Sequence, residues 1–470
     1  MTKWMVAAKK ADFKQIAEQN HISMILARLI RNRDITENTQ IEQYLYGKID
    51  HLHDPHKMTD MDKAAAVLKE KIISGKQIRI IGDYDVDGIC STYILFSGIS
   101  FFFFFVSCEL PDRIHDGYGL NESLITSALQ AGTDTILTCD NGIAAAAEIA
   151  FAKKQGMTVV VTDHHEVPFN IDAEGNRNEI LPAADAIIDP KRAEEKYPFT
   201  AICGAVVAYK LIQVLLEQGR GTLPYKEDEK VKLLNELLEF AALATVCDVM
   251  ELKDENRIIV KEGMKQMQKS GNIGLKALIH VNGLDEKKIS CYHLGFILGP
   301  CLNATGRLDS AMRALSLLMT SSSQEAAKIA GDLKALNDSR KEMTAKCVAQ
   351  AIAEVEKNRQ IPKVLVIYLP ECHEAIAGIV AGRVREKYGR PTLILTDAED
   401  CVKGSARSIP AYDMYQELSA CSIFFTKFGG HKMAAGLSMR KEDIGCLREN
   451  LHASCRLEED DFQEVLQIDM

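Results

Sequence analysis

The sequence of 470 residues contains few aromatic residues, at 6%, and a single tryptophan. It contains 13 cysteines but no Cys-x-x-Cys pair, so a zinc site built from thiolates is not expected. With no cleavable signal segment at its start, the chain is expected to be cytoplasmic, with its cysteines reduced. Residues 99–106, which include five consecutive phenylalanines, form a run far shorter than the roughly 20 residues of a membrane helix. They are predicted to form a buried strand.

The chain also lacks a net positive charge, because 66 Asp and Glu residues outnumber 56 Lys and Arg residues and the formal net charge is -10. Such a chain does not attract polyanions as a whole, so any contact with nucleic acid must come from a local basic groove. The composition, 47% hydrophobic and 26% charged, is typical of a globular protein rather than a disordered one. The length is sufficient for two or three domains, each with its own core.

Three short runs rich in β-branched and aliphatic residues each end in acidic or imidazole side chains. The runs cover residues 78–81, 134–139 and 157–162. The segments that follow them are Gly82-Asp83-Tyr84-Asp85-Val86-Asp87-Gly88, Asp140-Asn141-Gly142 and Asp163-His164-His165. A His-His pair in a loop is more often solvated than ligating. The repetition of acidic or imidazole side chains at three strand ends is what favours a binding site here.

Helical spacing between these runs predicts an α/β fold. Residues 91–97, 121–130 and 144–154 have this spacing, and strands alternating with helices indicate βαβ units in a mostly parallel, doubly wound sheet. Ligands of such sheets bind outside the carboxyl ends of the strands, so the acids and imidazoles are expected to converge on one site. A predicted helix at 233–244 leads to Asp248, a fourth acidic point.

A second, smaller α/β unit is predicted toward the C-terminus. Residues 364–368 and 392–395 are its expected strands, residues 375–387 the helix between them, and residues 324–357 a long connecting helix. The predicted division is an N-terminal helical segment (1–60), a catalytic domain (61–260), a helical connector (261–357), a substrate-binding domain (358–440) and a tail (441–470).

The first cluster favours phosphate-ester hydrolysis with two metal ions. The candidate ligands are Asp85, Asp87, Asp140, His164 and Asp248. Hard oxygen donors with one imidazole suit Mn²⁺ or Mg²⁺, and carboxylates around a bridging acid can hold two such ions about 3.5 to 4 Å apart. A calcium loop at residues 83–88 is the alternative, but the spaced glutamate of such a loop is missing and a strand precedes the segment.

Cationic and hydroxyl side chains in the second unit predict a binding site for phosphate or nucleic acid. They are Lys403, Ser405, Arg407 and Ser408, followed by Gly429-Gly430-His431. Around glycines, such donors can approach an anion closely. Arg113, Asn303 and Arg307 are further candidates for phosphate contacts, although an exposed arginine is more often a solvated surface residue.

These motifs resemble those of the DHH phosphoesterase superfamily and, within it, the RecJ-type family of single-strand-specific exonucleases with DHH and DHHA1 domains. The similarity spans about residues 20–465. It rests on the three acidic segments above, on Asp248 with Glu255-Asn256-Arg257, on Pro111-Asp112-Arg113, on Gly117-Tyr118-Gly119-Leu120, on Tyr197-Pro198-Phe199, on Asn303-Ala304-Thr305-Gly306-Arg307, on Gly404-Ser405-Ala406-Arg407-Ser408 and on residues 428–436.

The resemblance implies roles for individual residues. Asp85, Asp87, Asp140, His164 and Asp248 would bind the metal pair, with Asp83 as a further ligand or as a carboxylate that orients one. Asp83, Asp140 and His165 would be catalytic, with His165 on the scissile phosphate. Arg113, Asn303, Arg307, Ser405, Arg407 and His431 would position the phosphates of the strand.

The implied activity is a metal-dependent 5′-to-3′ exonuclease of single-stranded DNA in repair and recombination, with a single-strand-binding protein or a helicase as candidate partners and no membrane association. Two other functions stay open. One is hydrolysis of short oligonucleotides or other small phosphodiesters and phosphoanhydrides, as in nanoRNases, and the other is a catalytically silent nucleic-acid-binding module. Full-length relatives continue into an OB-fold that grips the strand, which this sequence is expected to lack.

Overall fold

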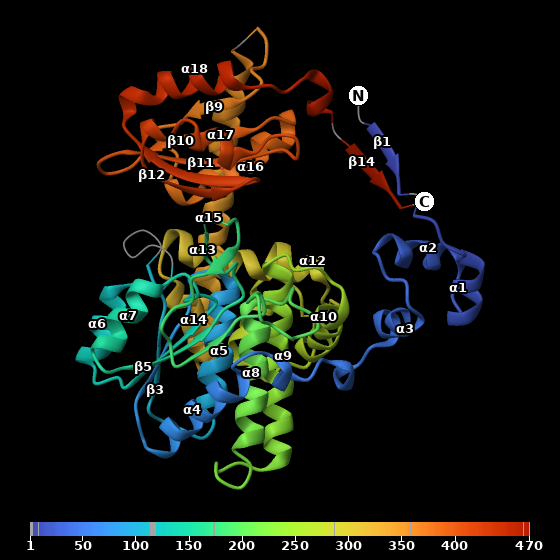
Figure 1. Ribbon diagram of the computed structural model, residues 1–470, viewed down its shortest axis with the longest axis vertical. Coiled ribbons are helices and arrows are strands. Elements are labelled where there is room, and N and C mark those ends of the chain that lie inside the picture. Colours follow the sequence, from blue (N-terminus) through green and yellow to red (C-terminus); the bar gives the residue numbers. More distant parts are fainter. Residues whose placement is uncertain are drawn as a thin grey trace. The chain divides into compact units, whose positions relative to one another are not determined.

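The computed structural model describes residues 3–7, 9–112, 119–172, 174–285, 287–357, 359–463 and 465–469. They divide into two compact units (Figure 1). The larger is Glu37–Asn337, and the smaller combines Met1–Thr36 with Asp338–Met470. The long helix α15, Ser323–Glu356, contains the boundary, and the finer five-part division stays a prediction.

A five-stranded parallel sheet organises the larger unit, with strand order β3-β2-β4-β5-β8. The strands are β2 (Ile78–Ile81), β3 (Val106–Glu109), β4 (Thr135–Cys139), β5 (Thr158–Thr162) and β8 (Ala186–Ile188). The order reverses at β2, where β3 lies on one side and β4 on the other. This reversal is the kind of switch point at which open α/β sheets bind ligands.

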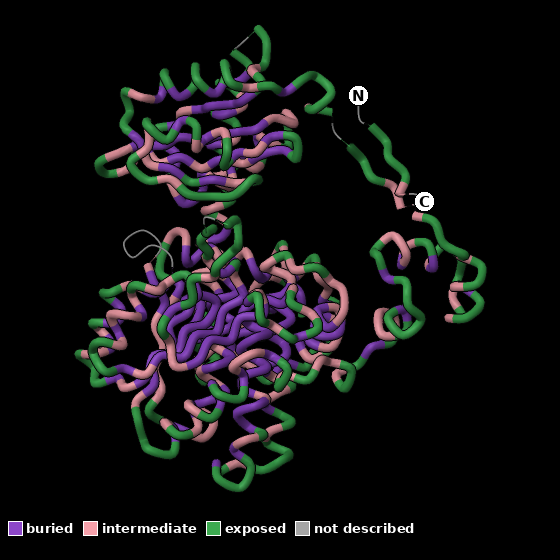
Figure 2. The backbone as a smooth tube through the Cα atoms, viewed as in Figure 1, coloured by how far each residue is buried: buried purple, intermediate pink, exposed green. Residues whose placement is uncertain are grey.

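Helices cover both faces of this sheet. Successive side chains of each strand point to opposite faces, so strands that are apolar throughout present two apolar faces that must both be buried. On β5, Val160 packs into the larger core, whereas Val159 and Val161 pack into the smaller core on the other face. The first core includes α4 (Met61–Ile73), α5 (Val86–Ser100), α8 (Gly204–Gln218) and α9 (Glu227–Cys247). The second includes α6 (Glu122–Gln130) and α7 (Ala146–Lys154) (Figures 1 and 2).

Further elements complete the larger unit. They are α3 (Asn38–Tyr46), η1 (Ile49–His51), η2 (Pro55–Lys57), the hairpin β6 (Phe169–Ile171) with β7 (Arg177–Glu179), α10 (Asp254–Met267), α11 (Ile273–Val281), α12 (Cys291–His293), η3 (Leu294–Leu298), α13 (Gly299–Leu308) and α14 (Ala311–Met319). The predicted helix that leads to Asp248 is α9, whose C-cap is Asp248 itself.

The smaller unit contains a second five-stranded sheet, with order β12-β13-β11-β10-β9. Its first two strands, β9 (Leu365–Tyr368) and β10 (Thr392–Asp397), are parallel, as expected for strands joined through the helix α16 (Glu374–Tyr388). The other strands are antiparallel: β11 (Val402–Arg407), β12 (Phe425–His431) and β13 (Ala434–Met439). The remaining elements of this unit are β1 (Lys3–Val6), α1 (Phe13–Asn20), α2 (Met24–Asn32), α17 (Met414–Ser419), η4 (Ser422–Phe424), η5 (Lys441–Asp443), α18 (Ile444–Ser454), η6 (Glu459–Phe462) and β14 (Val465–Ile468), which pairs with β1.

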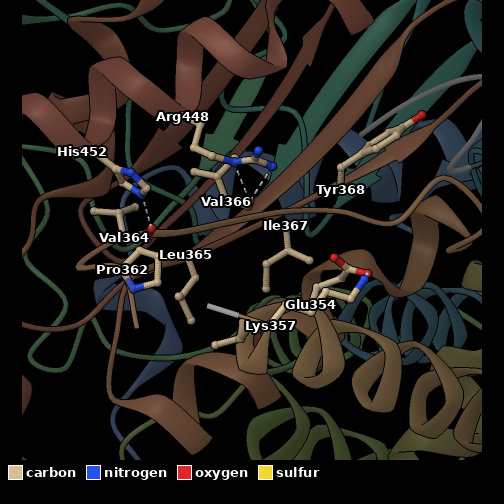
Figure 3. Close-up of a pocket in the computed structure, with 11 residues that line it drawn as sticks. Glu354, Lys357, Pro362, Val364, Leu365, Val366, Ile367, Tyr368, Arg448 and His452 are labelled. Atoms are coloured by element: carbon tan, nitrogen blue, oxygen red, sulfur yellow. Dashed lines mark hydrogen bonds and ion pairs between the residues drawn. The ribbon is translucent and has the colours of Figure 1, made fainter. Parts of the chain in front are cut away.

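Two side chains of α18 cover the outer edge of β9. Arg448 donates from Nε and Nη2 to the carbonyl of Val366, at 3.3 and 3.1 Å, and the ring Nε2 of His452 lies 2.9 Å from the carbonyl oxygen of Val364 (Figure 3). These side chains occupy carbonyls that an additional strand would need. They therefore protect this sheet edge from pairing with another chain.

The predicted fold class, a doubly wound α/β domain with a smaller α/β domain, is confirmed. The predicted strand over residues 99–106 is wrong. Helix α5 continues to Ser100, and β3 begins only at Val106. Between them Phe103 is buried, at 7% exposure, whereas Phe104 is 92% exposed. The connection from a helix to the next parallel strand must reverse direction, and at such a turn consecutive side chains cannot all face the core.

All 13 cysteines are free thiols. Among the described residues, no helix is both long enough and apolar enough to span a membrane.

The phenylalanine turn leads to a test of the fold. We expect Phe103→Ala to lower the free energy of unfolding by about 3 kcal/mol, because it leaves a cavity in the core. The matched control Phe104→Ala should change it by less than about 0.5 kcal/mol, because that ring lies in solvent. Chemical denaturation followed by circular dichroism measures both values. Equal losses for the two variants would support the strand instead.

Candidate active site

Acidic and imidazole side chains gather at the carboxyl ends of the strands of the larger unit. Asp83, Asp85 and Asp87 follow β2, Asp140 follows β4, and His164 and His165 follow β5. Asp248 reaches the same place from the end of α9. Most of these side chains are buried. The structure therefore brings together every predicted metal ligand.

The loop after β2 is held by backbone N–H groups. The Asp85 carboxylate caps α5 and accepts from the N–H groups of Asp87 and Gly88, at 2.9 and 3.1 Å. A Cβ atom at position 88 would lie 2.3 Å from the carbonyl oxygen of Asp83, so only glycine fits there. The side-chain oxygen of Asn303 accepts from the N–H of Val86 at 3.2 Å, which fixes the loop from α13.

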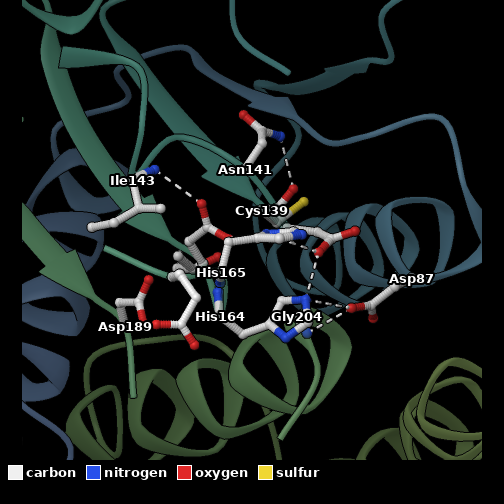
Figure 4. Close-up of polar contacts among 12 residues, drawn as sticks. Asp87, Cys139, Asn141, Ile143, His164, His165, Asp189 and Gly204 are labelled. Atoms are coloured by element: carbon white, nitrogen blue, oxygen red, sulfur yellow. Dashed lines mark hydrogen bonds and ion pairs between the residues drawn. The ribbon is translucent and has the colours of Figure 1, made fainter. Parts of the chain in front are cut away.

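The N-terminus of α8 holds the Asp87 carboxylate. The N–H groups of Gly204 and Ala205 donate to its two oxygens at 2.7 and 2.8 Å (Figure 4). Free N–H groups and the helix dipole both stabilise negative charge at this end of a helix. A Cβ atom at Gly204 would lie 2.9 Å from the Cβ of Asp140. Glycine therefore lets α8 approach the cluster closely.

His164 lies at the centre of the cluster. Its Nε2 atom is 3.0 Å from Asp140, 3.4 Å from Asp87 and 3.8 Å from Asp248 (Figure 4). Burial lowers the pKa of His164, which favours the neutral ring that a cation requires of an imidazole ligand.

The donor atoms form three overlapping groups that could each hold a cation. Within each group all ligand atoms lie within 4.8 Å of one another. The groups are Asp87, His164 and Asp248; Asp140, His164 and His165; and Asp83, Asp85 and Asp140. Asp140 belongs to two of them, the position expected of an acid that bridges two ions. Oxygen donors with one or two imidazoles fit Mn²⁺ or Mg²⁺.

The crowding of carboxylates raises their pKa values. Burial and then the charges of Asp87 and Asp85 raise the pKa of Asp140 well above its usual range. Burial and the same two neighbours raise the pKa of Asp248 to about 8. Like charges this close oppose one another's ionisation, and a bound divalent cation would remove that opposition.

Asp163 holds the imidazole ring of His165 in its protonated form. Its Nδ1 atom lies 2.7 Å from the Asp163 carboxylate, which also accepts from the N–H groups of Ile143 and His164 (Figure 4). Burial alone would lower the pKa of His165, but the bond to Asp163 outweighs it and raises the pKa to about 9. The side chain is 45% exposed, so this imidazolium can donate to an anion outside the cluster.

Glu255 and Asn256, which accompany Asp248 in the family motif, position helices and do not reach the cluster of predicted ligands. Glu255 on α10 forms a fully buried ion pair with Lys210 on α8, at 2.9 Å, and accepts from the Tyr197 hydroxyl at 2.6 Å. The Asn256 side chain donates to the carbonyls of Ala201 and Glu251. These contacts fix the start of α8, which holds Asp87.

The predicted phosphate contacts fall into three places. Asn303 and Arg307 lie on α13, where a Cβ atom at Gly306 would come within 2.5 Å of the Tyr84 carbonyl oxygen, so this helix packs against the loop of Asp83 to Asp87. Since the oxygen of Asn303 is engaged by Val86, its amide nitrogen is the part left for a phosphate. Arg113 lies outside the described residues.

Ser405, Arg407 and His431 form a second group within the smaller unit. Arg407 on β11 and His431 on β12 are both opposite Ala434 of the strand between them. Ser405 is opposite Gly436, which in turn is opposite Gly429. Glycines at these two positions leave a flat floor between polar side chains, where a phosphate backbone could approach closely.

Sequence reasoning missed two parts of the site. One is the pair of N–H groups at Gly204 and Ala205, which carries no side-chain signal. The other is Asp189, a fully buried acid after β8, whose pKa burial and the charge of Asp163 raise to about 8 (Figure 4). Its signal was present, because Ile187-Ile188-Asp189 repeats the pattern of a strand that ends in an acid.

Comparison with known proteins agrees with this geometry. The DHH family, N-terminal domain, matches residues 77–245, and the DHHA1 domain matches residues 362–456. The single-stranded-DNA-specific exonuclease RecJ of Escherichia coli (strain K12) is 34% identical over 89% of this chain and 72% of its own length. The chain belongs to the RecJ family. The resemblance to DHH phosphoesterases is thereby confirmed.

Two further RecJ proteins match almost the whole chain. RecJ of Bacillus subtilis (strain 168) is 35% identical over 100% of this chain and 57% of its own length. The crystal structure of RecJ in complex with Mn²⁺ from Thermus thermophilus superposes with a TM-score of 0.80 at 26% identity, and it covers 99% of this chain and 64% of the Thermus chain. This chain therefore spans somewhat more than half the length of these two RecJ proteins.

The raised pKa values predict how stability depends on pH and metal. A carboxyl whose pKa is raised on folding holds its proton more tightly in the folded state, so its contribution to stability falls as pH rises toward the folded value. Asp248, with a pKa of about 8, and His165, with a pKa of about 9, both act in this direction. In chelator, we expect the midpoint temperature of thermal unfolding to decrease as the pH is raised from 6.5 to 9. We expect Mn²⁺ to increase this midpoint most at pH 9.

The same scans with Asp140→Asn test where the cation binds. This variant should lose most of the Mn²⁺-induced rise, because it lacks the acid shared by two ligand groups. The matched control is Asp228→Asn, which makes the same chemical change at an exposed position in the first turn of α9. An equal Mn²⁺ response in both variants would place the cation elsewhere.

Proposed function

We propose that this chain is a metal-dependent exonuclease that hydrolyses single-stranded DNA from its 5′ end. The observation that carries the proposal is the pair of ligand groups formed by Asp87, His164 and Asp248 and by Asp83, Asp85 and Asp140, beside the imidazolium of His165. Membership of the RecJ family supports the substrate. The Thermus structure is a complex with Mn²⁺, which agrees with the donor set of this site.

The proposed roles follow from the contacts of each side chain. Asp85, Asp87, Asp140, His164 and Asp248 would hold two Mn²⁺ or Mg²⁺ ions, with Asp83 completing the group that contains Asp85 and Asp140. Such ions lower the pKa of bound water and neutralise phosphoryl charge. The N–H groups of Gly204 and Ala205 keep the Asp87 oxygens oriented toward His164.

His165 would donate a hydrogen bond to the scissile phosphate and stabilise the negative charge that builds up on its oxygens. Asp163 keeps this ring oriented and protonated at neutral pH, because its carboxylate accepts from Nδ1. The opposite nitrogen, Nε2, is then the donor toward the substrate.

Strand positioning would come from the predicted phosphate contacts. Asn303 and Arg307 lie on α13, the helix that packs on the loop of Asp83 to Asp87. We propose that Arg113 contacts a phosphate together with them. Ser405, Arg407 and His431 would bind phosphates on the glycine floor of the smaller unit. A helicase or a single-strand-binding protein is the proposed partner, because either delivers single strands. We propose a cytoplasmic location because the proposed substrate is DNA.

A labelled-strand assay tests this function. Single strands labelled at the 5′ or the 3′ end, a duplex and a dinucleotide are incubated with the protein in Mn²⁺, Mg²⁺ or chelator. We expect immediate release of the 5′ label as a mononucleotide, slow loss of the 3′ label, and no cleavage in chelator. Asp140→Asn should lower the rate by at least about 100-fold because the metal pair loses its shared ligand, while Asp228→Asn cleaves at the normal rate.

The other two functions give different results in this assay. Cleavage confined to the dinucleotide would indicate a hydrolase of small phosphodiesters. Strand binding without metal-dependent cleavage would indicate a silent binding module, and either result would overturn the proposal.

A further inference from the structure

Two exposed aromatic rings stack on each other at the surface of the larger unit. Tyr292 and Phe296 are 62% and 69% exposed, and their ring centroids lie 5.3 Å apart with an interplanar angle of 24°. Large apolar rings gain free energy from burial, so a pair left in solvent has no evident role in folding.

The backbone around the pair explains why both rings point outward. Tyr292 belongs to α12 and Phe296 to the π-helical turn η3, which interrupts the helix before α13. Leu294 and Leu298 of the same turn are fully buried. Rings four residues apart thus share the outer face while the leucines anchor the inner face. π-Helical turns within helices are found frequently at functional sites.

This turn packs directly on the end of α9 that delivers the metal ligand Asp248. The Cys247 thiol donates to the Leu294 carbonyl at 3.6 Å, and a Cβ atom at Gly295 would lie 3.4 Å from a methyl carbon of Val246. A Cβ atom at Gly299 would come within 2.3 Å of the Cys247 sulfur, so glycine is required for this approach. The aromatic pair is therefore fixed to the helix end that precedes Asp248.

Val249, the residue after Asp248, is a further exposed apolar side chain. It is 86% exposed and has a φ of +57°, a left-handed conformation that β-branched residues rarely adopt. Strained backbone of this kind is concentrated at functional sites. The conformation ends α9 at Asp248 and leaves the valine side chain in solvent.

We propose that Tyr292 and Phe296 form a stacking platform for a nucleobase of a single strand whose phosphate lies at the metal cluster. An outer ring face of the stacked pair can accept the planar face of any base, so the contact would favour unpaired strands without reading their sequence. Three apolar side chains are too few for a protein interface of ordinary size. This inference rests on the proposed function, because it assumes a nucleic-acid strand at the cluster.

Binding of a fluorescent single strand with a hydrolysis-resistant phosphorothioate backbone, measured by anisotropy in Mn²⁺, tests the platform without cleavage. We expect Phe296→Ala and Tyr292→Ala to raise the Kd about 10-fold, the usual order for a lost base–aromatic stack, and Phe296→Trp to keep the affinity. The matched control is Phe104→Ala, which removes another exposed ring from the same unit and should leave the Kd unchanged.

Strands with one abasic position, moved along the chain, identify the stacked base. At one position the abasic strand should bind the natural protein about 10-fold more weakly, yet bind Phe296→Ala no more weakly than the intact strand does, because the same contact is already lost. Wild-type affinity in both alanine variants, or losses that simply add at every position, would overturn the inference.

Metal-dependent cleavage by the natural protein is measured alongside. Cleavage with unchanged binding by the alanine variants would overturn the platform alone. Absence of both cleavage and strand binding in the natural protein would overturn the proposed function and the platform with it.

Discussion

The structure depends on the mutual repulsion of carboxylates that are buried at one end of a sheet. Asp87, Asp140 and Asp248 all lie within 3.8 Å of one imidazole nitrogen, and burial together with neighbouring negative charge raises the pKa of Asp140 and of Asp248. Without compensation such a cluster opposes folding, because ionised acids are expensive to bury. The fold must therefore provide both a rigid frame and positive charge.

Helix ends and glycines provide the compensation that belongs to the chain itself. The N-termini of α5 and α8 hold Asp85 and Asp87, while Gly88 and Gly204 permit backbone contacts that any side chain would prevent. Two hydrophobic cores hold the sheet from both faces, so these loops have little freedom to relax. The remaining charge is best balanced by divalent cations, so the same repulsion that weakens the fold gives the site its affinity for metal.

The sequence was sufficient for the parts of this arrangement that are local in the chain. Strands that end in acids, such as the one before Asp140, could be read directly, and parallel-sheet topology then predicted their convergence. The contact between Gly204 and Asp87 could not be predicted, because it joins residues 117 positions apart through backbone atoms of α8. The prediction of a strand at the phenylalanine run was wrong for a different reason. Hydrophobicity alone does not show where a chain must turn, and Phe104 lies at the turn.

The division of labour in the site explains why its motifs indicate chemistry better than substrate. The proposed metal ligands and His165 would act on a phosphate alone, which DNA, RNA and dinucleotides share. Discrimination must then come from groups that contact bases or several successive phosphates, and those groups lie outside the acidic motifs. Tyr292 on α12, Phe296 on η3, and Asn303 and Arg307 on α13 belong to three consecutive helical elements. These elements pack on the loop of Asp85 and on the end of α9, so a change in them can alter substrate choice without altering a single metal ligand.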